Sequence, residues 1–244
     1  MANGETTQRS ELDGDSVTRV MREHAAATLS HEPEVTLILD GMDLRREGAE
    51  SQEDLMRVKA LGGGLVNGYR SFNVLGLGED EARGLLYHHL FSSHEPGFES
   101  ENREIQHAID ATEASLKTFA GPKTWVMDAG FDNDDVWWRV WGHDSHLVCR
   151  VYHFERLVEW QTATGAWEER YLDATFKHLT PLATVDTTLE VRLKGQRRAK
   201  RQSVTVHLSA VPIRVYAPGD KSRPSLSGSS KSRLKARPVI PGIC

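Results

Sequence analysis

The chain has 244 residues, of which 39% are hydrophobic, 27% charged and 7% aromatic. This composition is typical of one or two globular domains and excludes a wholly disordered or collagen-like chain. Residues 1–122 carry 11 Lys and Arg against 22 Asp and Glu, whereas residues 123–244 carry 19 against 13. The second part therefore has a net charge of +6, which predicts an anionic partner, first of all nucleic acid.

The sequence contains no run of about 18 apolar residues that could form a membrane-spanning helix. Its first residues lack the basic and apolar regions of a signal peptide. The cysteines are Cys149, inside an apolar run, and Cys244, the last residue. Two cysteines so placed form neither a disulfide framework nor a zinc site. We therefore expect a reduced, cytoplasmic protein.

In the first third of the chain, a polar segment precedes a short helix expected over 16–29. The continuous apolar run at 35–39 is rich in β-branched residues, which predicts a strand buried on both faces. Asp40 directly follows this run. Two further strands are expected at 69–77 and 83–91, and the short polar loop between them suits a hairpin.

The middle third alternates between helices and strands. Apolar residues spaced three or four positions apart predict an amphipathic helix over 99–120. The short apolar run at 124–127 predicts a strand that ends at Asp128, and a helix at 132–142 and a strand at 147–151 are expected to follow.

The last third has a different character. Strand-like alternation without helical periodicity occurs at 156–160, 184–193 and 203–216. Residues 217–244 hold four of the nine prolines, six serines and no aromatic residue. Such a composition cannot form a packed core, so we expect a disordered tail.

The two short apolar strands that end in Asp40 and Asp128 are the main chemical signal. Strands at the centre of a sheet can bring their ends together, and two carboxylates there repel each other unless a cation lies between them. Mg²⁺ or Mn²⁺ can be held in this way when substrate phosphate and water complete the coordination shell. Aspartate also commonly follows a strand as a turn or capping residue. The spacing alone leaves both interpretations open.

The segments Leu39–Arg45 (LDGMDLR) and Val126–Asp132 (VMDAGFD) resemble the first and second acidic blocks of DDE transposases. The likeness is closest to bacterial insertion-sequence transposases with an RNase H-like core and a β-strand insertion. The order of the expected elements is similar as well, so the resemblance covers residues 30–216. It implies an α/β fold, with an RNase H-like mixed sheet flanked by helices. It also implies metal-dependent cleavage and transfer of DNA strands at transposon ends.

By this resemblance, Asp40 and Asp128 are the first two catalytic, metal-binding carboxylates, and Mg²⁺ or Mn²⁺ is the cofactor. Asp43 competes with Asp40 for the first position, but Asp40 directly ends the apolar strand whereas Asp43 lies three residues into an expected loop. The competitors of Asp128 are acidic residues that fit the start of a helix more simply: Asp132, Asp134 and Asp135.

The family also has a third carboxylate, a glutamate on a helix after the β insertion, within a Tyr–Arg–Glu signature. No glutamate follows Tyr216 in this sequence, and the single aspartate there is Asp220. We therefore expect a C-terminally truncated or frameshifted member with little or no strand cleavage by this chain alone. An unrelated metal-dependent nuclease would need a third carboxylate from elsewhere, such as Glu104 or Glu159, and nothing in the sequence places either one at the site.

A basic stretch lies between two of the expected strands of the last third. A solvated hairpin tip is the simpler interpretation, but the resemblance favours contact with DNA phosphates, which would make the affinity depend on salt. The residues expected near phosphate are Arg192, Lys194, Arg197, Arg198, Lys200 and Arg201.

The sequence thus predicts a fragment of a DDE transposase that binds double-stranded DNA at transposon ends, with a second copy or a full-length transposase as a protein partner. The alternative is a catalytically inactive inhibitor, derived from a transposase, that binds DNA or the transposase itself. Four parts are expected: a polar segment with a short helix (1–29), a partial RNase H-like core (30–151), a β-rich insertion (152–216) and a disordered Pro-, Ser-, Lys- and Arg-containing tail (217–244).

Overall fold

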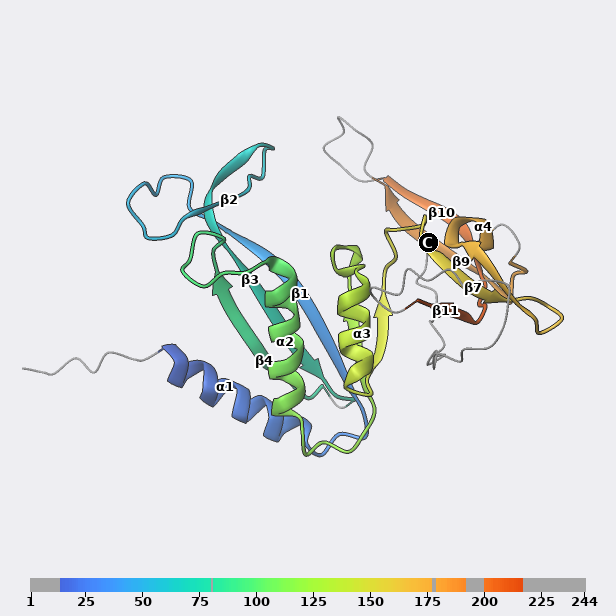
Figure 1. The fold of residues 1–244 in the computed structure, drawn as a ribbon, viewed down its shortest axis with the longest axis horizontal. Helices are drawn as coiled ribbons and strands as arrows, with labels where there is room; N and C mark the ends of the chain where they lie inside the picture. The colour runs from blue at the N-terminus through green and yellow to red at the C-terminus, as the bar shows by residue number, and fades with distance from the viewer. Residues whose placement is uncertain (1–13, 80, 177–178, 192–199, 217–244) are drawn as a thin grey trace, which may run out of the picture. The chain divides into compact units, whose positions relative to one another are not determined.

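The structure is a computed structural model that describes residues 14–79, 81–176, 179–191 and 200–216 (Figure 1). With the remaining residues left aside, the chain divides into two compact units. The first comprises the described residues of Met1–Met127 and Arg139–Leu147, and the second comprises those of Asp128–Trp138 and Val148–Cys244.

The first unit is an α/β sheet structure. Its elements in chain order are α1 (Gly14–Leu29), β1 (Val35–Arg45), β2 (Met56–Lys59), β3 (Leu65–Leu77), β4 (Arg83–Phe91), α2 (Glu101–Ser115) and β5 (Lys123–Met127). A 3₁₀ turn η1 (Ala129–Phe131), helix α3 (Asp134–Gly142) and strand β6 (His146–Cys149) follow. The unit boundary crosses both α3 and β6, so these two elements contribute to both units.

The strands of the first unit form one mixed sheet. Its main path runs β2-β3-β1-β5-β6, and β4 pairs with the same edge of β3 as β2 does. Strand β3 is antiparallel to both β1 and β4, whereas β5 is parallel to β1. Helix α2 supplies the long connection from β4 to β5 that a parallel pairing requires. Strands β4, β3 and β1 are antiparallel neighbours, and β5 pairs with the other edge of β1 and runs parallel to it. This is the RNase H-like arrangement, so the predicted fold class is confirmed.

Helix α2 forms where the apolar spacing predicts it. The side chain of Ser100 caps its amino end by accepting a hydrogen bond from the backbone N–H of Arg103 at 3.2 Å. Its buried stripe repeats every three or four residues and consists of Glu104, Ile105, Ala108, Ile109, Thr112 and Glu113. None of the helices within the described residues is long and apolar enough to cross a membrane.

One face of the sheet forms the core of the first unit. Leu37 and Leu39 of β1 are 0% and 2% exposed. Trp125 of β5, which lies opposite Leu37, is 0% exposed. Trp125 Nε1 donates a hydrogen bond to Glu113 of α2 at 2.9 Å, so this face is the one that α2 covers (Figure 1). The charged Glu113 is therefore built into the core rather than facing solvent.

Helix α1 packs closely on the strand pair β3 and β4. A Cβ atom added to Gly84 would lie 2.5 Å from Cβ of Ala25, and one added to Gly76 would lie 2.5 Å from Cδ1 of Leu29. Both distances are shorter than van der Waals contact, so only glycine allows the helix to approach the strands this closely. Glycine within a strand often marks such a close approach.

The opposite face of the sheet carries a row of polar residues between apolar ones. Asp40 of β1 pairs with Asn73 of β3, and Asn73 pairs with His88 of β4. The Asn73 Oδ1 and His88 Nδ1 atoms lie 2.7 Å apart. Four apolar residues of the same face are 36–56% exposed: Met42, Leu44, Leu75 and Leu90.

Strand β1 is longer than predicted. The sequence placed Asp40 at the carboxyl end of the strand, but pairing with β3 continues from Asp40 opposite Asn73 to Arg45 opposite Gly68. Only the pairing with β5 ends at Leu39. The residues after Asp40 have weak strand propensity by themselves, and the partner strand overrides that preference.

The second unit is rich in β-strands. Strands β7 (Leu157–Gln161), β8 (Trp167–Tyr171) and β11 (Ile213–Val215) form an antiparallel sheet in the order β11-β7-β8. Strands β9 (Ala183–Val191) and β10 (Lys200–Leu208) pair with each other, and α4 (Leu172–Phe176) follows β8 directly. The single strand expected over 203–216 is wrong, because β10 and β11 lie in different sheets.

Candidate metal centre

The pairing of β1 with β5 determines the positions of the two predicted aspartates along the sheet. Leu39 lies opposite Met127 in parallel register, and it is the last pair between these strands. Asp40 follows Leu39 within β1, and Asp128 directly follows the last residue of β5. Both aspartates are exposed.

Asp128 is held by two short-range contacts within the second unit. Its Oδ1 atom accepts a hydrogen bond from the backbone N–H of Gly130 at 2.8 Å, which caps η1. Its carbonyl oxygen accepts a hydrogen bond from Cys149 Sγ at 3.4 Å. Burial raises the pKa of the Cys149 thiol to about 12, so the thiol stays protonated and serves as a donor rather than a nucleophile.

Asp43 does not lie in a loop, as the sequence suggested, but in β1 opposite Arg70 of β3. Its Oδ1 atom is 3.9 Å from Arg70 Nε, and its Oδ2 atom accepts a hydrogen bond from the backbone N–H of Lys59 at 3.4 Å. Because side chains alternate along a strand, Asp43 and Asp40 lie on opposite faces of the sheet. The Asp43 carboxylate thus has partners of its own on the core side.

The acidic residues after Asp128 separate into two kinds. Asp134 and Asp135 lie in the first turn of α3, as predicted. Asp132 lies before that helix, and its side chain is 0% exposed. It accepts hydrogen bonds from the backbone N–H groups of Tyr152 and His153 and from Arg156, so it is not free to bind a metal ion.

The two other carboxylates considered from the sequence also have partners. Glu104 Oε2 lies 3.5 Å from His89 Nε2, and Glu159 Oε2 lies 3.6 Å from Arg214 Nη1. Among the residues that the structure describes, no group of three or more His, Cys, Asp or Glu side chains could hold a metal ion.

The donor chemistry at Asp40 and Asp128 still suits a hard cation. Both side chains offer carboxylate oxygens to solvent, and Mg²⁺ can be bound through only one or two carboxylates when phosphate and water supply the other ligands. The Asp128 Oδ1 atom is engaged with Gly130.

Two residues of the predicted phosphate-binding cluster lie within the described chain. Lys200 and Arg201 begin β10, and both are exposed. Arg201 Nε lies 3.1 Å from Glu190 Oε1 of β9, so part of its charge is used within the hairpin. The remaining members fall outside the described residues: Arg192, Lys194, Arg197 and Arg198.

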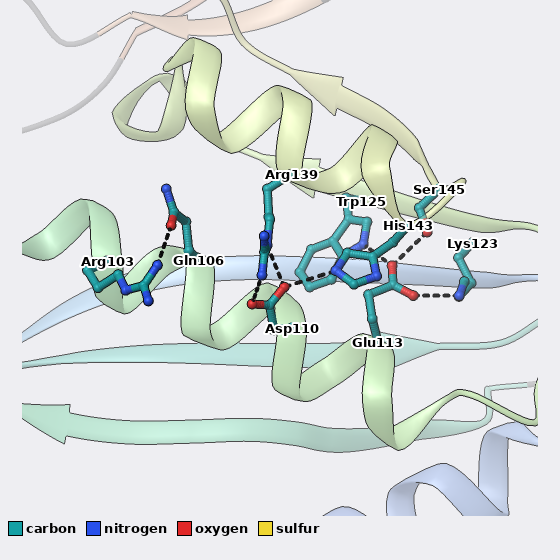
Figure 2. Close-up of polar contacts among 9 residues, drawn as sticks. All are labelled: Arg103, Gln106, Asp110, Glu113, Lys123, Trp125, Arg139, His143 and Ser145. Atoms are coloured by element: carbon teal, nitrogen blue, oxygen red, sulfur yellow. Dashed lines mark hydrogen bonds and ion pairs between the residues drawn. The ribbon is translucent and has the colours of Figure 1, made fainter. Parts of the chain in front are cut away.

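Sequence reasoning missed a polar network in the core of the first unit. Glu113, with a side chain only 3% exposed, binds Lys123 Nζ at 2.5 Å, Trp125 Nε1 at 2.9 Å and Ser145 Oγ at 2.6 Å (Figure 2). One signal could have revealed it: Glu113 follows Ile109 by four positions, which places a charge on the buried stripe of α2.

A second cluster lies one helical turn earlier, where Asp110 binds Arg139 and His143 of the α3 region (Figure 2). Burial by itself would raise the pKa of Asp110, but the hydrogen bonds from Arg139 and His143 outweigh it, and the net effect lowers that pKa. These contacts fasten α2 to α3.

No protein-family model matches the chain, and no curated protein matches it. Among solved structures it is similar to two transposase complexes. A Mos1 transposase paired-end complex with the left transposon end is 11% identical over 60% of this chain and 46% of that chain, with a TM-score of 0.27. A Mos1 mariner paired-end complex with Mn is 12% identical over 73% and 54%, with a TM-score of 0.29. The chain spans about half the length of these structures.

Proposed function

We propose that this protein derives from a DDE transposase and binds double-stranded DNA at transposon ends, with Asp40 and Asp128 as ligands of a divalent ion, Mg²⁺ or Mn²⁺. The observation that supports this most is the parallel pairing of Leu39 with Met127, after which the two aspartates follow. The acidic blocks that contain them resemble those of the insertion-sequence transposases, and the RNase H-like strand order agrees with that resemblance.

A divalent ion held by these carboxylates would polarise the scissile phosphodiester of the bound DNA. The residues of the chain itself would supply the two carboxylate ligands and the phosphate contacts, the latter from the basic cluster that ends in Lys200 and Arg201. Since phosphate contacts release counterions, we expect DNA affinity to fall at least about tenfold between 50 and 200 mM salt.

The alternative function is a non-catalytic protein that binds DNA or a full-length transposase. It is supported by the partners of the other carboxylates considered for the site, since Asp132 and Glu159 pair with arginines and Glu104 lies 3.5 Å from His89. We therefore propose that the chain by itself binds DNA with little or no strand cleavage, whatever the intact family does.

A single experiment distinguishes these outcomes. The purified chain is incubated with Mn²⁺ and a labelled duplex taken from the DNA that flanks its gene. A shifted but uncut band is the expected result. Cleavage that Asp40→Ala and Asp128→Ala abolish would show that the chain is an active enzyme. Glu101→Gln is the control, because that half-exposed carboxylate lies at the start of α2 and pairs with Arg70. Absence of any shift at 50 mM salt would contradict the proposal.

A further inference from the structure

Asp132 is a buried carboxylate four residues after Asp128. Its side chain is 0% exposed and receives three hydrogen bonds, from the backbone N–H of Tyr152 at 2.6 Å, the backbone N–H of His153 at 2.7 Å and Arg156 Nη1 at 2.7 Å. A buried charge is tolerated only when it is paired and hydrogen-bonded to this degree. The loop after Asp128 is therefore fastened to the segment that follows β6.

Arg156 extends this fastening into α3. Its guanidinium group is only 10% exposed, and its Nε atom lies 2.9 Å from Asp134 Oδ1 in the first turn of the helix. The same group lies over the ring of Trp137 at 4.0 Å from the centroid. The planar guanidinium group thus bridges two carboxylates and an aromatic ring at once, a geometry that lysine cannot reproduce.

The other end of the loop is fixed at Asp128 itself, by the Gly130 N–H on Oδ1 and by Cys149 Sγ on the carbonyl oxygen. The stretch from Asp128 to Asp134 is therefore held at both ends by residues of the second unit.

We propose that Asp132 and Arg156 are positioning residues that fix the orientation of the Asp128 carboxylate for metal binding. This inference rests on the proposed function, which makes Asp128 a ligand. Neither side chain touches the ion. Their role is to limit the conformations of the loop that carries Asp128, as outer-shell partners do in established metal sites.

The test compares Asp132→Asn with a matched control. Asparagine has the same shape but only one acceptor oxygen and no charge, so it cannot satisfy three donors. The control is Glu113→Gln, which neutralises another buried carboxylate that also receives three hydrogen bonds. Glu113 lies on α2 and contacts the first half of β5, whereas Asp132 lies beyond the carboxyl end of that strand. Both variants are expected to lower the melting temperature.

Mn²⁺ affinity is measured by electron paramagnetic resonance. We expect Asp132→Asn to raise the Kd about 10- to 100-fold. Glu113→Gln should leave it within about twofold, since the three partners of Glu113 lie outside the loop from Asp128 to Asp134. If Asp132→Asn fails to fold, Arg156→Lys serves instead, with a smaller loss expected. Wild-type affinity in the variant at Asp132 would overturn the inference.

A second readout does not depend on the metal. The Gly130 amide is held by Asp128 Oδ1, so its hydrogen exchange reports the order of the loop directly. We expect Asp132→Asn to accelerate this exchange at least tenfold and Glu113→Gln to leave it unchanged. Unaltered exchange in Asp132→Asn would refute the positioning role. A wild-type protein that binds no Mn²⁺ would instead refute the proposed function.

Discussion

Leu39 of β1 lies opposite Met127 of β5 in a parallel pairing that ends at these two residues. The two paired residues are 88 positions apart in the sequence, and the connection through α2 brings their strands together. Beyond this pair the strands continue differently, because β1 remains paired with β3 whereas β5 gives way to the η1 turn. Asp40 is thus held by strand pairing and Asp128 by a loop.

The choice between Asp40 and Asp43 can be tested by metal binding. We expect Asp40→Asn to weaken Mn²⁺ binding at least about tenfold, since the site loses one of two proposed ligands. Asp43→Asn should change it less than about twofold, because Asp43 lies on the opposite face with Arg70. Isothermal titration calorimetry measures both. The reverse order of effects would assign the site to Asp43.

The buried Glu113 network predicts a large effect on stability. Glu113→Gln leaves the ammonium group of Lys123 without its 2.5 Å partner, and breaking a buried pair from one side costs about 3 kcal/mol of unfolding free energy. The matched surface variant is Glu101→Gln, whose carboxylate is 43% exposed and which should cost less than about 1 kcal/mol. Urea unfolding measures both, and equal losses would contradict the prediction.

The close approach of α1 to β4 predicts that Gly84 cannot be enlarged without strain. In Gly84→Ala the new methyl group would meet Ala25 at 2.5 Å, and overpacking of this kind costs about 1–3 kcal/mol. Gly62→Ala is the control, because nothing lies within 4 Å of a Cβ atom there. Thermal unfolding should show a lower melting temperature for the first variant alone. Equal melting temperatures would mean that α1 does not pack on β4 as described.

The Asp110 cluster predicts a dependence of stability on acid pH. The pKa of Asp110 is lowered in the folded protein: burial opposes the shift, and the bonds from Arg139 and His143 exceed that opposition. A lowered folded pKa stabilises the protein above the ordinary value of 3.8, and this stability is lost as the pH falls through the folded pKa. Asp110→Asn should therefore flatten the curve of unfolding free energy against pH below about pH 4.

Urea unfolding at several pH values between 2 and 6 measures this effect. Asp110 and Arg139 are 33% and 44% exposed, so salt screens their interaction and the difference should shrink in 1 M NaCl. An acid dependence identical in the wild type and the variant would contradict the assignment.

The elements with regular periodicity could be predicted from the sequence, and those defined by their partners could not. Strand β4 has the predicted bounds, and α2 occupies the middle of the predicted helix. Strand β2, by contrast, is only four residues long and exists because it pairs with the beginning of β3. The turn between them depends on Gly63 and Gly64, with φ of +93° and +80°, which glycine adopts without strain.

The candidate site shows the same division. An aspartate after a short apolar strand is visible in the sequence, so Asp40 and Asp128 could be named. The role of Asp132 could not be, because its three donors come from residues 20 to 24 positions later. Those contacts are non-local and leave no periodic pattern in the sequence.

The polar row of Asp40, Asn73 and His88 also helps to specify the register of β3 against its neighbouring strands. Asn73 lies between Phe72 and Val74, which are 2% and 0% exposed on the core side. If β3 slipped by one residue against β1, Asn73 would enter the apolar core and both neighbours would face water. Misaligned pairings of β3 with β1 are therefore less stable than the native one while the chain is still folding. The stable alignment places Asp40 opposite Asn73.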